Sequence, residues 1–124
     1  MVDKKKILVV DDSKTIRQQV GFTLTNAGFD VVEAEDGHDG IAKLEANVDI
    51  NMIISDVNMP NMDGLEMVEK IRNKEEFKTL PIILLTTESS GEKVDRAKNS
   101  GAIGWLVKPF NPEQLVGAVK KLAK

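Results

Sequence analysis

The sequence predicts an α/β protein in which an open, parallel β-sheet is covered by helices on both faces. Short apolar runs alternate along the chain with segments of helical periodicity, and polar turns separate them. Strands that alternate with helices are typical of a parallel sheet with right-handed crossovers. The longer runs do not alternate apolar with polar residues, which indicates strands buried on both faces.

Five apolar runs predict the strands. The second run is the shortest and is followed by Glu33, so we expect it at an edge of the sheet. The runs are residues 7–10, 31–32, 52–54, 82–85 and 105–107.

Five segments with apolar residues three or four positions apart predict the helices. Ser13, Asp63 and Asn111 precede the first, third and fifth segments and suit the N-cap position. Gly28 and Gly101 suit the stops of the first and fourth segments. The apolar positions are Ile16, Val20, Leu24 and Ala27; Ile41 and Leu44; Leu65, Val68 and Ile71; Val94 and Ala97; and Leu115, Ala118, Val119 and Leu122.

Composition narrows the class of protein. The chain has 124 residues, 41% of them hydrophobic and 30% charged, which suits a single domain with one sizeable core. A net charge of −3 gives no basic surface for nucleic acid, and the absence of cysteine excludes disulfides and thiolate chemistry. The apolar run after the charged N-terminus is too short for a signal peptide or membrane span. We therefore expect a cytoplasmic monomer.

Polar residues follow four of the five predicted strands. Asp11 and Asp12 follow the first, Asp56 the third, Thr86 the fourth and Lys108 the fifth. Sites in open α/β sheets form at the carboxyl ends of the strands, near the point where strand order reverses. We therefore expect three carboxylates, a hydroxyl and an ammonium to gather at one edge of the sheet.

Such a cluster favours a bound cation. Two unit charges 4 Å apart repel by about 4 kcal/mol at an effective dielectric constant near 20, and one lysine cannot neutralise three carboxylates. Ligands that are all oxygen prefer hard metals, so Mg²⁺ is expected, with Mn²⁺ as the alternative. Asp56 stands alone at the end of its run and is the candidate nucleophile for an acyl phosphate. The metal and Lys108 would stabilise the transferring phosphoryl group, with Thr86 as a hydroxyl donor.

Four motifs, in this order and at these separations, resemble the receiver domain of two-component response regulators, in form the single-domain chemotaxis regulators of the CheY type. The resemblance spans residues 6–122. It implies a flavodoxin-like sheet of order 2-1-3-4-5 with five helices, and a single receiver domain over residues 1–124. The motifs are ILVVDDS at 7–13, DVNMPNMDG at 56–64, Thr86, and KPF at 108–110.

The resemblance also implies roles for the matching residues. Asp56 would be phosphorylated by a partner histidine kinase. Asp11, Asp12, Asp56 and the backbone carbonyl of Asn58 would bind Mg²⁺. Lys108 would contact the phosphoryl group.

The peptide bond from Lys108 to Pro109 would be cis. Thr86 and Trp105 would form a switch pair that changes the surface of the fourth helix, fifth strand and fifth helix. An effector protein, with the flagellar motor switch as one candidate, would bind this surface. No output domain follows Leu122, so we expect output through protein contact.

Two positions depart from the family pattern. Thr87 stands where the family usually has a very small residue. We expect it to narrow the access of phosphodonor or water to the site and so to slow dephosphorylation. Trp105 stands where tyrosine is common, and plain core packing is its alternative interpretation. Asn58 and Glu88 match a polar pair that tunes dephosphorylation, although Glu88 could equally be a solvated surface residue.

Three other functions compete. A flavin-binding module would need a phosphate-binding loop where Asp11 and Asp12 stand. An aspartyl-phosphate hydrolase would need a second acid at the position of Asn58, and a cap domain. A relay that passes phosphate to another protein's histidine stays open, because the sequence discriminates it poorly from a switch.

Overall fold

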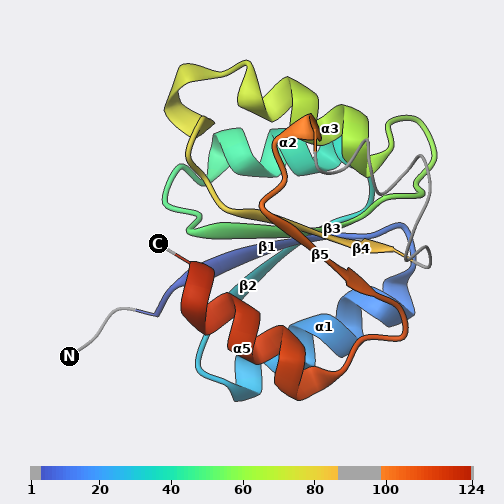
Figure 1. Ribbon diagram of the computed structural model, residues 1–124, viewed down its shortest axis with the longest axis vertical. Helices are drawn as coiled ribbons and strands as arrows, with labels where there is room; N and C mark the ends of the chain where they lie inside the picture. The colour runs from blue at the N-terminus through green and yellow to red at the C-terminus, as the bar shows by residue number, and fades with distance from the viewer. Residues whose placement is uncertain (1–3, 87–98, 124) are drawn as a thin grey trace.

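A computed structural model describes residues 4–86 and 99–123, and these residues contain one five-stranded sheet with helices on both faces (Figure 1). The strand order is β2-β1-β3-β4-β5, and every neighbouring pair is parallel. This confirms the predicted fold class and strand order, including the edge position of the second strand. The order reverses between β1 and β3, so their carboxyl ends mark the place where a site is expected.

The element bounds differ from the predicted runs by a few residues. The strands are β1 (Lys6–Val10), β2 (Asp30–Ala34), β3 (Met52–Asp56), β4 (Ile82–Thr86) and β5 (Gly104–Val107). The helices are α1 (Lys14–Asn26), α2 (Gly37–Ala46), α3 (Gly64–Arg72) and α5 (Pro112–Leu122). A short 3₁₀ helix, η1 (Glu75–Phe77), was not predicted.

The fourth predicted helix lies mostly outside the described residues, and so do its apolar positions Val94 and Ala97. Ser100 is helical and Gly101 follows it with a φ of +109°, where the sequence predicts the helix stop. Among residues 4–86 and 99–123, no helix is long and apolar enough to span a membrane.

Each face of the sheet carries its own core. In Figure 1, α2 and α3 lie on one side of the sheet, and α1 and α5 on the other. Leu8 and Val10 of β1 pack in the core with α2 and α3, while Ile7 and Val9 pack in the core with α1 and α5. All four side chains are at most 1% exposed. Each such burial contributes about 1.5–3 kcal/mol, which explains why the central strands are apolar at successive positions.

The predicted helix caps are confirmed. The side chains of Ser13, Asp63 and Asn111 each accept a hydrogen bond from the backbone N–H three residues further on. Gly28 has a φ of +95°. The N–H of Gly28 donates to the carbonyl of Thr25, and the N–H of Phe29 to that of Leu24, which is the Schellman pattern.

The start of α3 packs directly against the end of β3. The N–H of Gly64 donates to the carbonyl of Val57 at 2.9 Å, and a Cβ atom on Gly64 would overlap the backbone oxygen of Asp56. Only glycine permits this approach. The contact therefore fixes α3 and the loop before it relative to Asp56.

We expect Gly64→Ala to lower the free energy of unfolding by about 1–3 kcal/mol, because the added methyl group has no space. Gly117 in α5 is the matched control, since a Cβ there meets nothing within 4 Å. Gly117→Ala is expected to raise stability by about 0.5–1 kcal/mol. Chemical denaturation followed by circular dichroism checks both values, and a Gly64→Ala variant as stable as the wild type would contradict the packing account.

Candidate functional site

Three carboxylates meet at the carboxyl edge of the sheet. Asp11 directly follows β1, Asp12 comes next, and Asp56 is the last residue of β3. One oxygen from each carboxylate lies within 4.8 Å of the others. Asp11 and Asp56 are buried, whereas Asp12 is exposed. The three residues come together because β1 and β3 are adjacent and parallel.

Lys108 reaches this cluster from β5, which is two strands away from β3. Its Nζ lies 3.2 Å from Oδ2 of Asp11 and 3.2 Å from Oδ2 of Asp56. Burial on its own would lower the pKa of Lys108, but the charges of Asp56 and Asp11 outweigh it and raise the pKa. The ammonium is therefore held in its charged form between the two buried carboxylates.

The backbone directs the Lys108 side chain toward the cluster. Its N–H donates to the carbonyl of Thr86 at 2.7 Å, and the peptide bond from Lys108 to Pro109 is cis. The bond to Thr86 continues the pairing of β4 with β5 one residue beyond the end of β5.

Every polar atom of Asp11 has a partner. Its Oδ1 accepts from the N–H of Ser13 at 2.9 Å, Oδ2 accepts from Lys108, and its N–H donates to Ala34 of β2 at 3.1 Å. Burial raises the pKa of Asp11, the Ser13 N–H opposes this, and the charge of Asp56 raises the pKa further. Lys108 lowers the pKa but does not reverse this rise, so a further cation in the cluster would favour the charged form of Asp11.

Asp56 is held by contacts on both oxygens. Oδ1 accepts from the N–H of Val57 at 2.8 Å, while Oδ2 faces Lys108. Its backbone carbonyl accepts from the hydroxyl of Ser55 at 2.8 Å. These contacts fix the direction of the carboxylate. Asp56 as a whole residue is only 7% exposed.

Thr86 and Trp105 lie on the same face of neighbouring strands. Thr86 is buried at the end of β4, and Trp105 in β5 pairs with Leu84 in the strand register. Trp105 is partly buried against the core that contains α2 and α3. Because alternate strand residues share a face, Thr86 points to the side of Leu84 and Trp105. Asn58 is exposed, two residues after Asp56. The candidate tuning residues Thr87 and Glu88 lie outside the described residues.

Sequence reasoning did not single out Arg17 of α1, which touches the cluster through the backbone. Its Nη1 donates to the carbonyl oxygen of Asp11 at 2.6 Å, and its Nε forms an ion pair with Glu33 of β2 at 3.1 Å. The first contact has no signature in the sequence, because every residue has a carbonyl.

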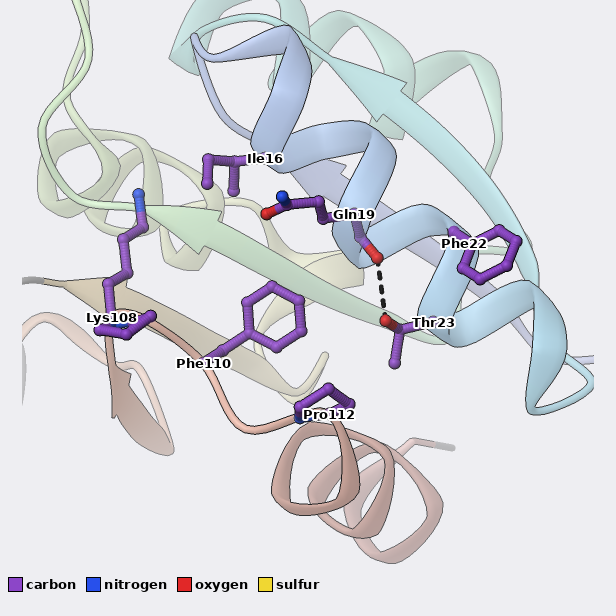
Figure 2. A pocket seen from close by; sticks show the side chains of 8 residues that line it. Ile16, Gln19, Phe22, Thr23, Lys108, Phe110 and Pro112 are labelled. Carbon is purple, nitrogen blue, oxygen red and sulfur yellow. Dashed lines mark hydrogen bonds between the residues drawn. The ribbon is translucent and has the colours of Figure 1, made fainter.

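A mostly apolar groove of about 360 Å³ lies beside Lys108, between α1 and the segment that leads into α5 (Figure 2). Ile16 and Phe22 line it from α1, and Phe110 and Pro112 from the opposite side. In Figure 2 the Lys108 side chain extends away from the Phe110 ring. Lys108 therefore borders both the groove and the carboxylate cluster.

The donor set fits a hard divalent cation. All three candidate ligands are carboxylate oxygens, two of them buried. The ion pairs of these carboxylates within the described residues both involve Lys108, which leaves the cluster with excess negative charge. Mg²⁺ is commonly bound by one or two carboxylates, water and phosphate oxygens, so Asp11, Asp12 and Asp56 could hold it with solvent completing the shell.

Comparisons with known proteins agree with this arrangement. The model of the response regulator receiver domain family matches residues 7–120. Chemotaxis protein CheY1 of Helicobacter pylori is 46% identical over 89% of this chain and 90% of its own length. A chemotaxis protein CheY homolog of Campylobacter jejuni is 44% identical over 89% of this chain and 85% of its own.

A solved structure of similar form is chemotaxis protein CheY4 of Vibrio cholerae. It superimposes with a TM-score of 0.91 at 48% identity, covering 97% of this chain and 99% of its own. The chain therefore belongs to the response regulator receiver domain family, whose members act in two-component signalling.

The raised pKa of Asp11 gives a pH-dependent prediction for the metal-free protein. Because the folded-state pKa lies above the model value of 3.8, the folded state binds this proton more tightly than the unfolded state. The stability contribution is present below pH 3.8 and is lost as pH rises through the folded pKa. Asp11→Asn does not titrate, so its stability relative to the wild type should increase as pH rises through this window.

Chemical denaturation in the presence of a chelator, from about pH 3.5 to neutrality, measures the difference in unfolding free energy between the wild type and Asp11→Asn. If this difference in unfolding free energy does not change with pH, the raised pKa of Asp11 is contradicted.

Proposed function

We propose that this chain is a phosphorylation switch, in which a partner histidine kinase transfers a phosphoryl group to Asp56 in a Mg²⁺-dependent reaction. The observation that carries the proposal is the placement of Asp56. One oxygen lies 3.2 Å from the Lys108 ammonium, and the carboxylate lies within 4.8 Å of the oxygens of Asp11 and Asp12. A buried carboxylate beside a lysine and a candidate metal site suits phosphoryl transfer.

The reaction forms one bond and breaks one. A carboxylate oxygen of Asp56 attacks the phosphorus atom, and the bond from phosphorus to the donor histidine nitrogen breaks. The donor ring carries a proton on its other nitrogen, so it leaves as neutral imidazole and Asp56 becomes an acyl phosphate. Val57 holds one oxygen of Asp56, so the oxygen beside Lys108 is available as the nucleophile. Lys108 stabilises negative charge on the phosphoryl oxygens. A metal bound by Asp11, Asp12, Asp56 and the carbonyl of Asn58 would act as a Lewis acid.

We propose that Thr86 and Trp105 transmit the signal. Phosphorylation would draw the Thr86 hydroxyl toward the phosphoryl group, and the space that it leaves would accommodate the Trp105 ring. Their common face on adjacent strands supports this coupling. The surface of the fourth helix, β5 and α5 would then change its affinity for an effector protein.

The relatives that are named chemotaxis proteins support a role in chemotaxis, with the flagellar motor switch as the candidate effector. Residues 1–124 would act as a single receiver domain. Asn58, Thr87 and Glu88 would set how fast water removes the phosphoryl group, so that the domain catalyses its own dephosphorylation.

Incubation with Mg²⁺ and a small acyl phosphate donor should add one phosphoryl group to the intact protein. Asp56→Asn should abolish the mass increase, because the amide is a poor nucleophile. Asp63→Asn is the matched control, since Asp63 caps α3 outside the cluster and should leave the mass increase unchanged. The absence of a mass increase in the wild type would contradict the proposed function, and its persistence in Asp56→Asn would move the acceptor elsewhere.

The switch pair can be tested separately from the chemistry. Trp105 is the single tryptophan, so fluorescence reports on it alone. Thr86→Val keeps the shape but removes the hydroxyl, and we expect it to accept the phosphoryl group, at a reduced rate, without the wild-type change in fluorescence. Thr86→Ser should retain the change. An unaltered response in Thr86→Val would show that the hydroxyl does not drive the movement of Trp105.

A further inference from the structure

We infer that Arg17 is a positioning residue for the metal site, because it fixes the peptide unit that joins Asp11 to Asp12. Two nitrogens of its guanidinium have partners on different elements. Nη1 donates to the carbonyl of Asp11 at 2.6 Å, and Nε pairs with Glu33 of edge strand β2 at 3.1 Å. The Arg17 side chain is only 15% exposed. The inference rests on the metal site of the proposed function.

The guanidinium is itself held in place. Arg17 lies in the first turn of α1, where its N–H donates to the carbonyl of Ser13 at 3.0 Å. The planar guanidinium contacts Asp11 through one nitrogen and Glu33 through another. Rotation of the guanidinium to improve one contact would therefore break the other. Arg17 thus connects α1, the loop after β1, and β2.

The carbonyl that Arg17 contacts controls the direction of Asp12. This oxygen belongs to the Asp11–Asp12 peptide unit, and rotation of that planar unit would redirect the Asp12 side chain. Asp11 is anchored by its N–H and both carboxylate oxygens. Within the described residues, by contrast, no hydrogen bond or ion pair holds the Asp12 carboxylate, which is exposed. Its position relative to Asp11 therefore depends on the backbone that Arg17 fixes.

Positioning and simple electrostatics predict opposite effects for the loss of Arg17. A positive charge beside three carboxylates repels cations, so its removal should tighten the binding of any divalent metal. Loss of positioning should instead weaken Mg²⁺, which demands near-ideal octahedral geometry. Ca²⁺ accepts flexible geometry and should be much less affected. The ratio of the two affinities therefore separates the two effects.

The test is a titration of wild type and variants with MgCl₂ and with CaCl₂, followed by Trp105 fluorescence and by calorimetry. Arg17→Gln should weaken Mg²⁺ binding by about tenfold, the lower end of the range for residues that orient metal ligands. Its Ca²⁺ affinity should change by less than about threefold, because the site can adapt to the larger ion. Lys14→Gln, on the same helix turn, removes the same charge without the carbonyl contact and should not weaken either ion.

Arg17→Lys retains the charge but cannot reach both partners, so its Mg²⁺ affinity should lie between those of wild type and Arg17→Gln. Metal-free denaturation of each variant checks that it is folded. If Arg17→Gln does not fold, Glu33→Gln replaces it, because this change removes only the outer anchor and should lower the Mg²⁺ to Ca²⁺ affinity ratio by a smaller factor.

Unchanged or tighter Mg²⁺ binding in Arg17→Gln would overturn the inference, and so would an equal loss for both ions. Either result leaves the proposed function intact if the wild type binds Mg²⁺ and is phosphorylated. Failure of the wild type to bind Mg²⁺ would instead contradict the proposed function itself.

Discussion

Mutual repulsion among Asp11, Asp12 and Asp56 is the constraint around which this edge of the sheet is arranged. A single pair of such charges at 4 Å repels by about 4 kcal/mol at an effective dielectric constant near 20, against a total stability of about 5–15 kcal/mol for a typical domain. The two cores of the sheet must supply the stability that holds these groups together. Lys108 offsets part of the charge, and its long side chain reaches across β4 to do so. The remaining negative charge is what makes the cluster suited to a metal ion.

The strand register also relates Asp56 to the proposed switch pair, Thr86 and Trp105. Asp56 pairs with Leu85 in the register of β3 and β4, and Thr86 pairs with Val107 in that of β4 and β5. β3 and β4 are buried along their whole length, so a change at Asp56 cannot be absorbed by loose packing around it. A single strand, β4, thus separates β3, which carries Asp56, from β5, which carries Trp105. A hydroxyl on the intervening strand is well placed to connect them.

Residue patterns were sufficient for the parallel α/β class, the caps and the meeting of charges at one edge, because these follow from rules about side chains and strand ends, whereas the strand order came from the family resemblance. Ser13 and Asp63 cap their helices as their residue types and positions suggest. Contacts between a side chain and a backbone carbonyl could not be found in this way. Arg17 binds the carbonyl of Asp11, and Arg72 binds the carbonyls of Gly101 and Phe77, yet none of these three carbonyls carries a sequence signal. Asp30, Glu33 and Ala34 of β2 also lay outside the predicted run, because an edge strand does not need apolar residues throughout.

Direct identification of the phosphorylated residue tests the account most sharply. The phosphorylated protein would be treated with borohydride, which reduces an acyl phosphate to an alcohol, then digested and sequenced by tandem mass spectrometry. The account predicts homoserine at position 56 and intact aspartate at positions 11 and 12, only when Mg²⁺ and the phosphodonor are both present. Homoserine at position 11 or 12, or reduction at position 56 without a divalent metal, would contradict it.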